Sequence, residues 1–89
     1  MDLKQITEIH DMNKERFSSG KELYDFLMFQ MQSHMVEVDD RKNNGDDHYR
    51  KEIADLAILA KLLAMCEGVD DSVFCERYKR FKEKIDVSS

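Results

Sequence analysis

The chain has 89 residues, which is the size of one small domain, and we expect a single helical domain over residues 1–89. It contains no proline, only three glycines and many Leu, Met, Lys and Glu residues, a composition typical of an all-α protein. The formal net charge of −5 disfavours direct nucleic-acid binding.

Three features of the sequence predict a cytoplasmic protein without a membrane segment. The longest apolar run is far shorter than the roughly 20 residues that a membrane-spanning helix needs. The opening MDLKQITEIHD has neither a basic start nor an apolar core, so no signal peptide is expected. Cys66 and Cys75 lie among apolar residues and are expected to be buried free thiols, as in a reducing compartment.

The first two helices are expected on either side of Ser18-Ser19-Gly20. The first runs from Asp2 to about Arg16, with several apolar residues near one side. Ser19 and Glu22 have the spacing of a capping box, so a second helix should begin there. Its apolar residues follow helical periodicity: Leu23, Leu27, Met31, Met35 and Val38. The segment YDFLMFQM is apolar around more than one side, which indicates more than one packing partner.

A charged segment, Asp39–Asp47, is expected to form a solvated loop. With Gly45 in the sixth position of a calcium-binding loop, Lys42 and Lys51 would occupy positions that need oxygen ligands. This excludes an EF-hand.

The third helix is expected to begin after Asp46 or Asp47, either of which can cap it. It should run to Cys66 or Glu67 and end at Gly68, which suits a C-terminal cap. Leu56 is expected on its apolar side.

A fourth helix is expected after a cap at Asp70, Asp71 or Ser72. Its apolar residues are spaced i, i+4, i+7 and i+11: Phe74, Tyr78, Phe81 and Ile85. Four helices with short connections predict an antiparallel bundle.

The two middle helices are more apolar than one small bundle can cover, so we expect a dimer or higher homo-oligomer through helices two and three. The residues that should not all fit inside one monomer are Phe26, Met28, Phe29, Ile58 and Leu62.

Four side chains of metal-ligand type are spaced so that they could meet. His34 and Glu37 lie three residues apart near the end of the second helix, and Glu52 and Asp55 lie three apart near the start of the third. In an antiparallel pair these two ends are neighbours, so three carboxylates and one imidazole could hold a divalent cation. The alternative is that the acids are solvated, with Asp55 paired to Lys51 and Glu52 favoured by the helix dipole.

The last helix also carries a basic face. Arg77, Arg80 and Lys84 are spaced i, i+3 and i+7, and this face could contact phosphate groups. The alternative is a solvated surface, because Glu76 and Glu83 are interleaved with them.

The motif E52-I-A-D55, followed by LAILAKLLAMCEGVD and VFCERYKRFKEK, carries a family resemblance. From Lys21 to Lys84 the chain resembles the MazG-like all-α nucleoside triphosphate pyrophosphohydrolases, in which an E-E-x-x-E helix precedes an E-x-x-D helix. The first motif is degenerate here, because Ser33 and His34 stand where the two glutamates belong and Glu37 alone is kept.

The resemblance implies a MazG-like helical bundle that binds a nucleotide through Mg²⁺ held by carboxylates, with Mn²⁺ as the alternative ion. Loss of two carboxylates should weaken the site, and His34 favours softer ions than Mg²⁺. We therefore expect a weak or degenerate nucleoside triphosphate pyrophosphohydrolase whose catalytic residues are unassigned. One alternative is a non-catalytic interaction module, such as a phage-type regulator or inhibitor, that sequesters a nucleotide or binds a protein partner. Another is a structural helical assembly.

Overall fold

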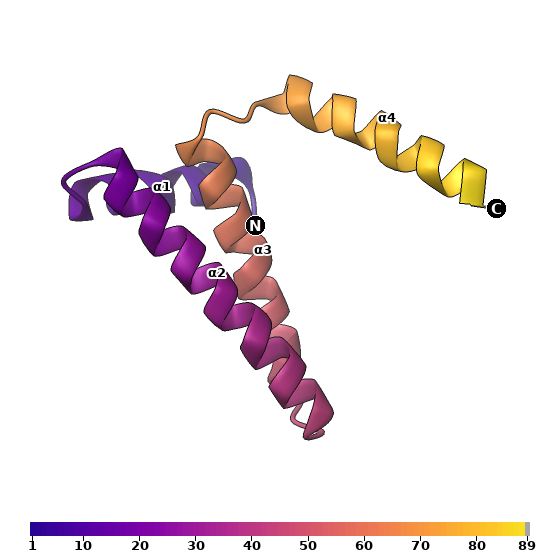
Figure 1. Ribbon diagram of the computed structural model, residues 1–89. Coiled ribbons are helices and arrows are strands. Elements are labelled where there is room, and N and C mark those ends of the chain that lie inside the picture. Colours follow the sequence, from indigo (N-terminus) through magenta and orange to yellow (C-terminus); the bar gives the residue numbers. More distant parts are fainter. Residues whose placement is uncertain (89) are drawn as a thin grey trace.

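The computed structural model describes the backbone of residues 1–88 and the side chains of residues 1–86. These residues form four helices and no strand, so the predicted all-α class is confirmed (Figure 1). The helices are α1 (Leu3–Arg16), α2 (Gly20–Asn43), α3 (Tyr49–Cys66) and α4 (Asp71–Ser88).

Each of the first two helices begins directly after a capping residue, Asp2 for α1 and Ser19 for α2. Asp2 accepts a hydrogen bond from the Gln5 backbone N–H, and the Gln5 side chain accepts one from Asp2 in return. Ser19 accepts from the Glu22 N–H at 3.2 Å, which confirms it as the N-cap of α2. The Glu22 carboxylate, however, accepts from the hydroxyl and N–H of Ser18, so the reciprocal bond of the predicted box is displaced by one residue.

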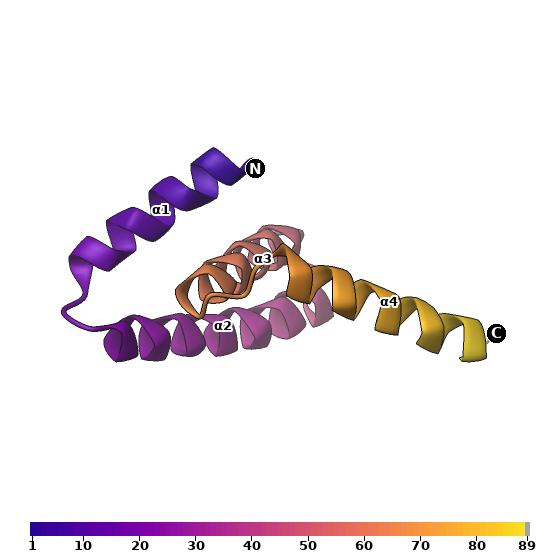
Figure 2. The ribbon, with the colours of Figure 1, turned by 90° about the horizontal axis from the view of Figure 1, so that it is seen from above.

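The end of α2 corrects the predicted loop. α2 continues to Asn43, so the part of the charged segment from residue 39 to 43 is helical. Nothing before Gly45 breaks the helix, and Arg41 and Lys42 stabilise its last turn by facing the negative end of the helix dipole. The connection is therefore only residues 44–48, and α2 and α3 lie side by side as an antiparallel pair (Figure 2).

Both ends of α3 are fixed by local hydrogen bonds. Asp46 accepts from the His48 N–H at 2.9 Å, so it stabilises the turn before α3, while His48 itself is the N-cap. At the other end the Gly68 N–H donates to Met65 and the Val69 N–H to Ala64, at 3.3 and 2.8 Å. This is a Schellman motif, and it requires the positive φ of 68° at Gly68. The predicted end of the third helix is confirmed.

The core lies where α1 crosses the α2–α3 pair. Its fully buried apolar side chains, among the residues described, are Ile6, Leu23, Leu27 and Leu62. Leu56, which we expected on the apolar side of the third helix, is only half-buried, whereas Leu62, which we counted among the apolar residues in excess of one monomer, is fully buried in the core. Both cysteines are free thiols, but Cys66 is only half-buried, and the prediction of burial was wrong for Cys75, which is exposed on α4.

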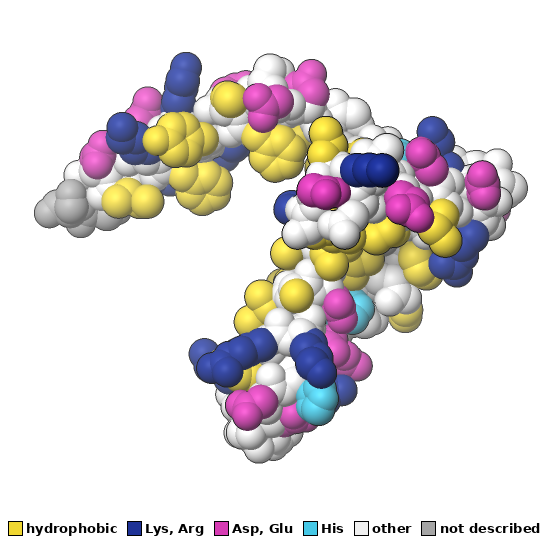
Figure 3. All heavy atoms as spheres, turned by 180° about the vertical axis from the view of Figure 1, so that it is seen from behind, with side chains coloured by type: hydrophobic (Ala, Val, Ile, Leu, Met, Phe, Trp, Pro, Cys, Tyr) yellow, Lys and Arg dark blue, Asp and Glu magenta, His cyan; other side chains and the backbone are white. Residues whose placement is uncertain are grey.

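α4 stands apart from the other helices. α1, α2 and α3 form a small bundle, whereas α4 packs against none of them within the described part of the chain (Figures 1 and 2). Every side chain from residue 71 to 86 is exposed. In the space-filling view the apolar side chains of α4 gather along one side (Figure 3). The fourth helix is present as predicted, but it does not join the bundle of its own chain.

No helix in the described part of the chain is both long enough and apolar enough to span a membrane.

Candidate metal centre

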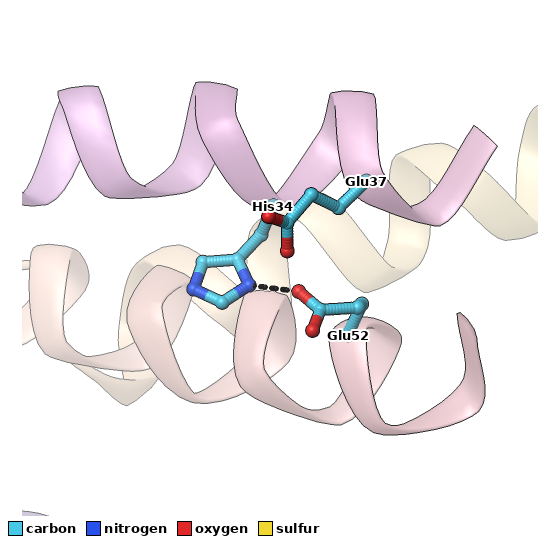
Figure 4. Close-up of side chains that lie close together, drawn as sticks. All are labelled: His34, Glu37 and Glu52. Carbon is cyan, nitrogen blue, oxygen red and sulfur yellow. Dashed lines mark hydrogen bonds and ion pairs between the residues drawn. The ribbon is translucent and has the colours of Figure 1, made fainter. Parts of the chain in front are cut away.

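The antiparallel α2–α3 pair brings three of the predicted metal ligands together. His34 and Glu37 lie on α2 and Glu52 lies on α3, with their functional groups directed toward one another (Figure 4). The His34 Nδ1 donates to a Glu52 carboxylate oxygen at 2.5 Å. One ligand atom from each of the three residues lies within 4.8 Å of the other two. We call these residues the His34–Glu37–Glu52 cluster.

Asp55, the fourth predicted ligand, lies at the rim of the cluster. Its Oδ2 is 4.0 Å from the His34 Nδ1, and its side chain is 52 % exposed. The Glu52 side chain is only 13 % exposed and that of His34 21 %. The helix therefore turns Glu52 inward and Asp55 outward.

Arg41 is a member of the site that the sequence reasoning missed. Its Nε lies 4.0 Å from a Glu52 oxygen, and its Nη1 donates to Asp46 at 2.9 Å. Charge patterning alone predicts a loop at this position. On a continuous helix Arg41 lies one turn beyond Glu37, and this spacing is the signal that could have identified it.

The charges around Glu52 favour its ionised form. Its hydrogen bond with His34 is the largest cause that holds the pKa of Glu52 below its ordinary value. The positive charge of Arg41 acts in the same direction. A carboxylate must be ionised to serve as a metal ligand, so Glu52 is in the required state at neutral pH.

The donor set can hold a divalent cation, because it offers one imidazole nitrogen and carboxylate oxygens from two facing helices. It can also persist as an ion-pair network. No buried side-chain nitrogen or oxygen among the described residues lacks a hydrogen-bond partner, so the cluster does not require an ion to be satisfied.

The predicted phosphate-binding residues do not join this cluster. Arg77, Arg80 and Lys84 lie on α4, which leaves α3 at the end opposite to Glu52 (Figure 1). Since α4 packs against neither α2 nor α3, these side chains do not line the cluster within one chain.

Comparison with family models, with curated proteins and with solved structures finds no match to the chain. The resemblance to the MazG-like proteins therefore stays a prediction.

Proposed function

We propose that the chain is a MazG-like nucleotide-binding protein that holds a divalent cation at the His34–Glu37–Glu52 cluster. The observation that carries this proposal is the convergence of three ligand-type side chains from α2 and α3 within 4.8 Å. A cation there attracts the phosphate groups of a nucleoside triphosphate, which two glutamates alone would repel. Because α4 lies away from the cluster, phosphate binding within one chain is assigned to the cation.

The cluster favours Mn²⁺ over Mg²⁺. Mg²⁺ demands nearly octahedral oxygen coordination, while an imidazole nitrogen suits softer ions. Arg41 also offsets part of the negative charge that would hold the ion. Any pyrophosphate release should be slow, since the metal-ligand helix keeps one carboxylate where the family pattern has three.

Thermal unfolding with added metal tests the proposal. A ligand that binds only the folded chain raises the melting temperature by mass action. Mn²⁺ should raise it for the wild type, and each common nucleoside triphosphate should add a further rise only when Mn²⁺ is present. Glu52→Gln should abolish the response to Mn²⁺. Glu15→Gln, which removes an exposed carboxylate from α1, is the matched control and should respond like the wild type.

Each variant is compared with itself in the absence of metal. A lower intrinsic stability of Glu52→Gln therefore does not affect the comparison of the shifts in melting temperature that Mn²⁺ causes. An equal Mn²⁺ response in Glu52→Gln, or no response of the wild type to millimolar Mn²⁺, would contradict a metal site at the cluster.

Restoring the degenerate motif tests the family relationship separately. Ser33→Glu combined with His34→Glu supplies two further carboxylates on the same turn of α2 and should strengthen Mg²⁺ binding. Pyrophosphate release from nucleoside triphosphates is then measured in the restored and wild-type chains. Unchanged Mg²⁺ affinity in the restored chain would count against the MazG-like assignment.

A non-catalytic interaction module is the second candidate, and the exposed apolar side of α4 favours it. The interaction module becomes the preferred function if neither Mn²⁺ nor any nucleotide changes the melting temperature of the wild type.

A further inference from the structure

The apolar side of α4 has no partner within the described part of its own chain. Phe74, Tyr78, Phe81 and Ile85 lie on one side of the helix and are between 55 and 67 % exposed. A single amphipathic helix of this length is only marginally stable in water, and helices in proteins are stabilised mostly by packing of their apolar faces. A contiguous exposed apolar patch of this kind marks an interaction surface.

The surface area indicates how large the missing contact is. The chain exposes 7060 Å², whereas a compact protein of 10.5 kDa exposes about 5400 Å². The excess is about 1600 Å², which lies within the range that obligate homodimers bury per subunit, about 1000–2500 Å². The radius of gyration is 15.5 Å, against about 12 Å for a compact chain of this length, so the chain is also more extended than a compact protein.

A cleft at the base of α4 continues the apolar surface. It has a volume of about 600 Å³ and lies between the start of α1, the end of α3 and the first turn of α4. Phe74 belongs both to this cleft and to the apolar side of α4, and Leu3, Met65 and Val69 line the cleft opposite it. The Schellman turn at Gly68 directs α4 out of the bundle. As a result, α4 does not cover the cleft of its own chain.

The charge distribution favours the bundle of a second copy as the partner. Five basic residues and a single acidic one lie between Arg77 and Lys84, although the whole chain has a net charge of −5. The charged residues that line the cleft are Asp2, Asp70, Asp71 and Lys61, which is an acidic excess. The basic segment 77–84 of α4 therefore complements the acidic lining of the cleft in another copy better than it complements the same segment of another α4.

We propose that two copies exchange their α4 helices. Each α4 places its apolar side in the concavity between the α1–α3 bundle and the α4 helix of the partner. The exchange is reciprocal, so the assembly closes as a two-fold dimer in which both apolar sides are buried. This interface is distinct from the one that the apolar middle helices predict, which is formed by α2 and α3.

Sedimentation equilibrium of two matched phenylalanine variants tests the exchange. Phe81 on α4 and Phe29 on α2 are 61 and 64 % exposed, so the same substitution removes a comparable apolar surface from each helix. The wild type should sediment at twice its mass of 10.5 kDa at micromolar concentration. Phe81→Gln should raise the dimer dissociation constant at least tenfold, while Phe29→Gln should change it less than about threefold. Circular dichroism of both variants checks that the helices are retained.

Three results would overturn the proposal. The first is a wild type that is monomeric at 100 µM, which would leave α4 for a different partner. The second is a dimer weakened by Phe29→Gln and unaffected by Phe81→Gln, which would place the interface on α2. The third is an open series of larger assemblies, which would show that α4 binds without reciprocal closure.

Discussion

Arg41 is the residue that most opposes cation binding at the His34–Glu37–Glu52 cluster. Its guanidinium lies 4.0 Å from Glu52 and competes with an ion for the same carboxylate. Arg41→Gln should therefore raise the affinity for Mn²⁺, by about three- to tenfold for a partly exposed charge at this distance. Isothermal calorimetry with Mn²⁺ measures the change, and Arg50→Gln is a control that removes an exposed charge outside the cluster. Equal affinities in the two variants would show that the cluster does not bind the ion.

Leu27 is the most deeply buried side chain of the core, with 1 % exposure. Leu27→Ala should lower the free energy of unfolding by about 2–5 kcal/mol, because it removes packed methyl groups and leaves a cavity. Met12→Ala, at a position that is 58 % exposed and outside the cleft, should cost less than about 0.5 kcal/mol. Urea unfolding of both variants at one protein concentration gives the comparison. A similar cost at both positions would mean that the core is not centred on Leu27.

Sequence spacing could predict the cluster but not the direction of every side chain. The i, i+3 pairs on two antiparallel helices were sufficient to place His34 and Glu37 near Glu52. The rotation of α3 about its axis, which turns Glu52 inward and Asp55 outward, depends on how α1 and α2 pack against it. The same rotation makes Leu62 rather than Leu56 the buried leucine of α3. The spacing of residues along one helix does not reveal how far that helix is rotated about its axis in the folded chain.

Among the helices, the end of α3 depends on the backbone of a single residue. Gly68 has a φ of 68°, which a side chain disfavours, and no atom lies within 4 Å of the position that a Cβ would take. Gly68→Ala should therefore cost about 1–2 kcal/mol from backbone strain alone. Gly20 is equally open but has no positive φ, so Gly20→Ala at the start of α2 should be neutral or stabilising. Thermal unfolding of the two variants at equal concentration checks the opposite signs.

The start of α4 should depend on pH. Hydrogen bonds from the Ser72 hydroxyl and the Val73 N–H hold the pKa of Asp70 below its ordinary value of 3.8. Because the lowered pKa belongs to the folded chain, the cap contributes fully above about pH 4 and is lost as the pH falls through the lowered value. Asp70→Asn keeps an acceptor but does not titrate. Amide exchange at Ser72 and Val73 should accelerate on acidification in the wild type relative to Asp70→Asn, and parallel changes in both would contradict the role of Asp70.

Helix boundaries were predictable where a capping residue or glycine marks them. Ser19 and Gly68 mark such boundaries, and the structure has its boundaries there. For the fourth helix the sequence offered Asp70, Asp71 or Ser72 as the cap, and the hydrogen bonds from Ser72 and Val73 go to Asp70. The end of α2 was misplaced because charged residues were read as a loop, although no helix breaker occurs before Gly45. Charge alone does not end a helix when, as with Arg41 and Lys42, it suits the helix dipole.

At the scale of the whole molecule, one chain buries few apolar side chains relative to the surface that it exposes. Among the described residues only Ile6, Leu23, Leu27 and Leu62 form the fully buried apolar core, while the molecule extends over 47 × 38 × 23 Å. The sequence predicted an excess of apolar surface, because this depends only on composition and chain length. It could not predict that α4 carries much of that excess, since the direction of α4 is set by the turn at Gly68.

The α2–α3 pair has a consequence for the order of events in folding. These two helices are adjacent in sequence and joined by residues 44–48 alone, so their contacts close short loops and should form rapidly. Docking of α4 on a second copy must wait for an encounter between chains. Refolding should therefore show a fast recovery of helical signal whose rate is independent of protein concentration, followed by a phase that accelerates with concentration. Stopped-flow circular dichroism over a tenfold concentration range can separate the two, and a single concentration-independent phase would mean that the chain reaches its final state alone.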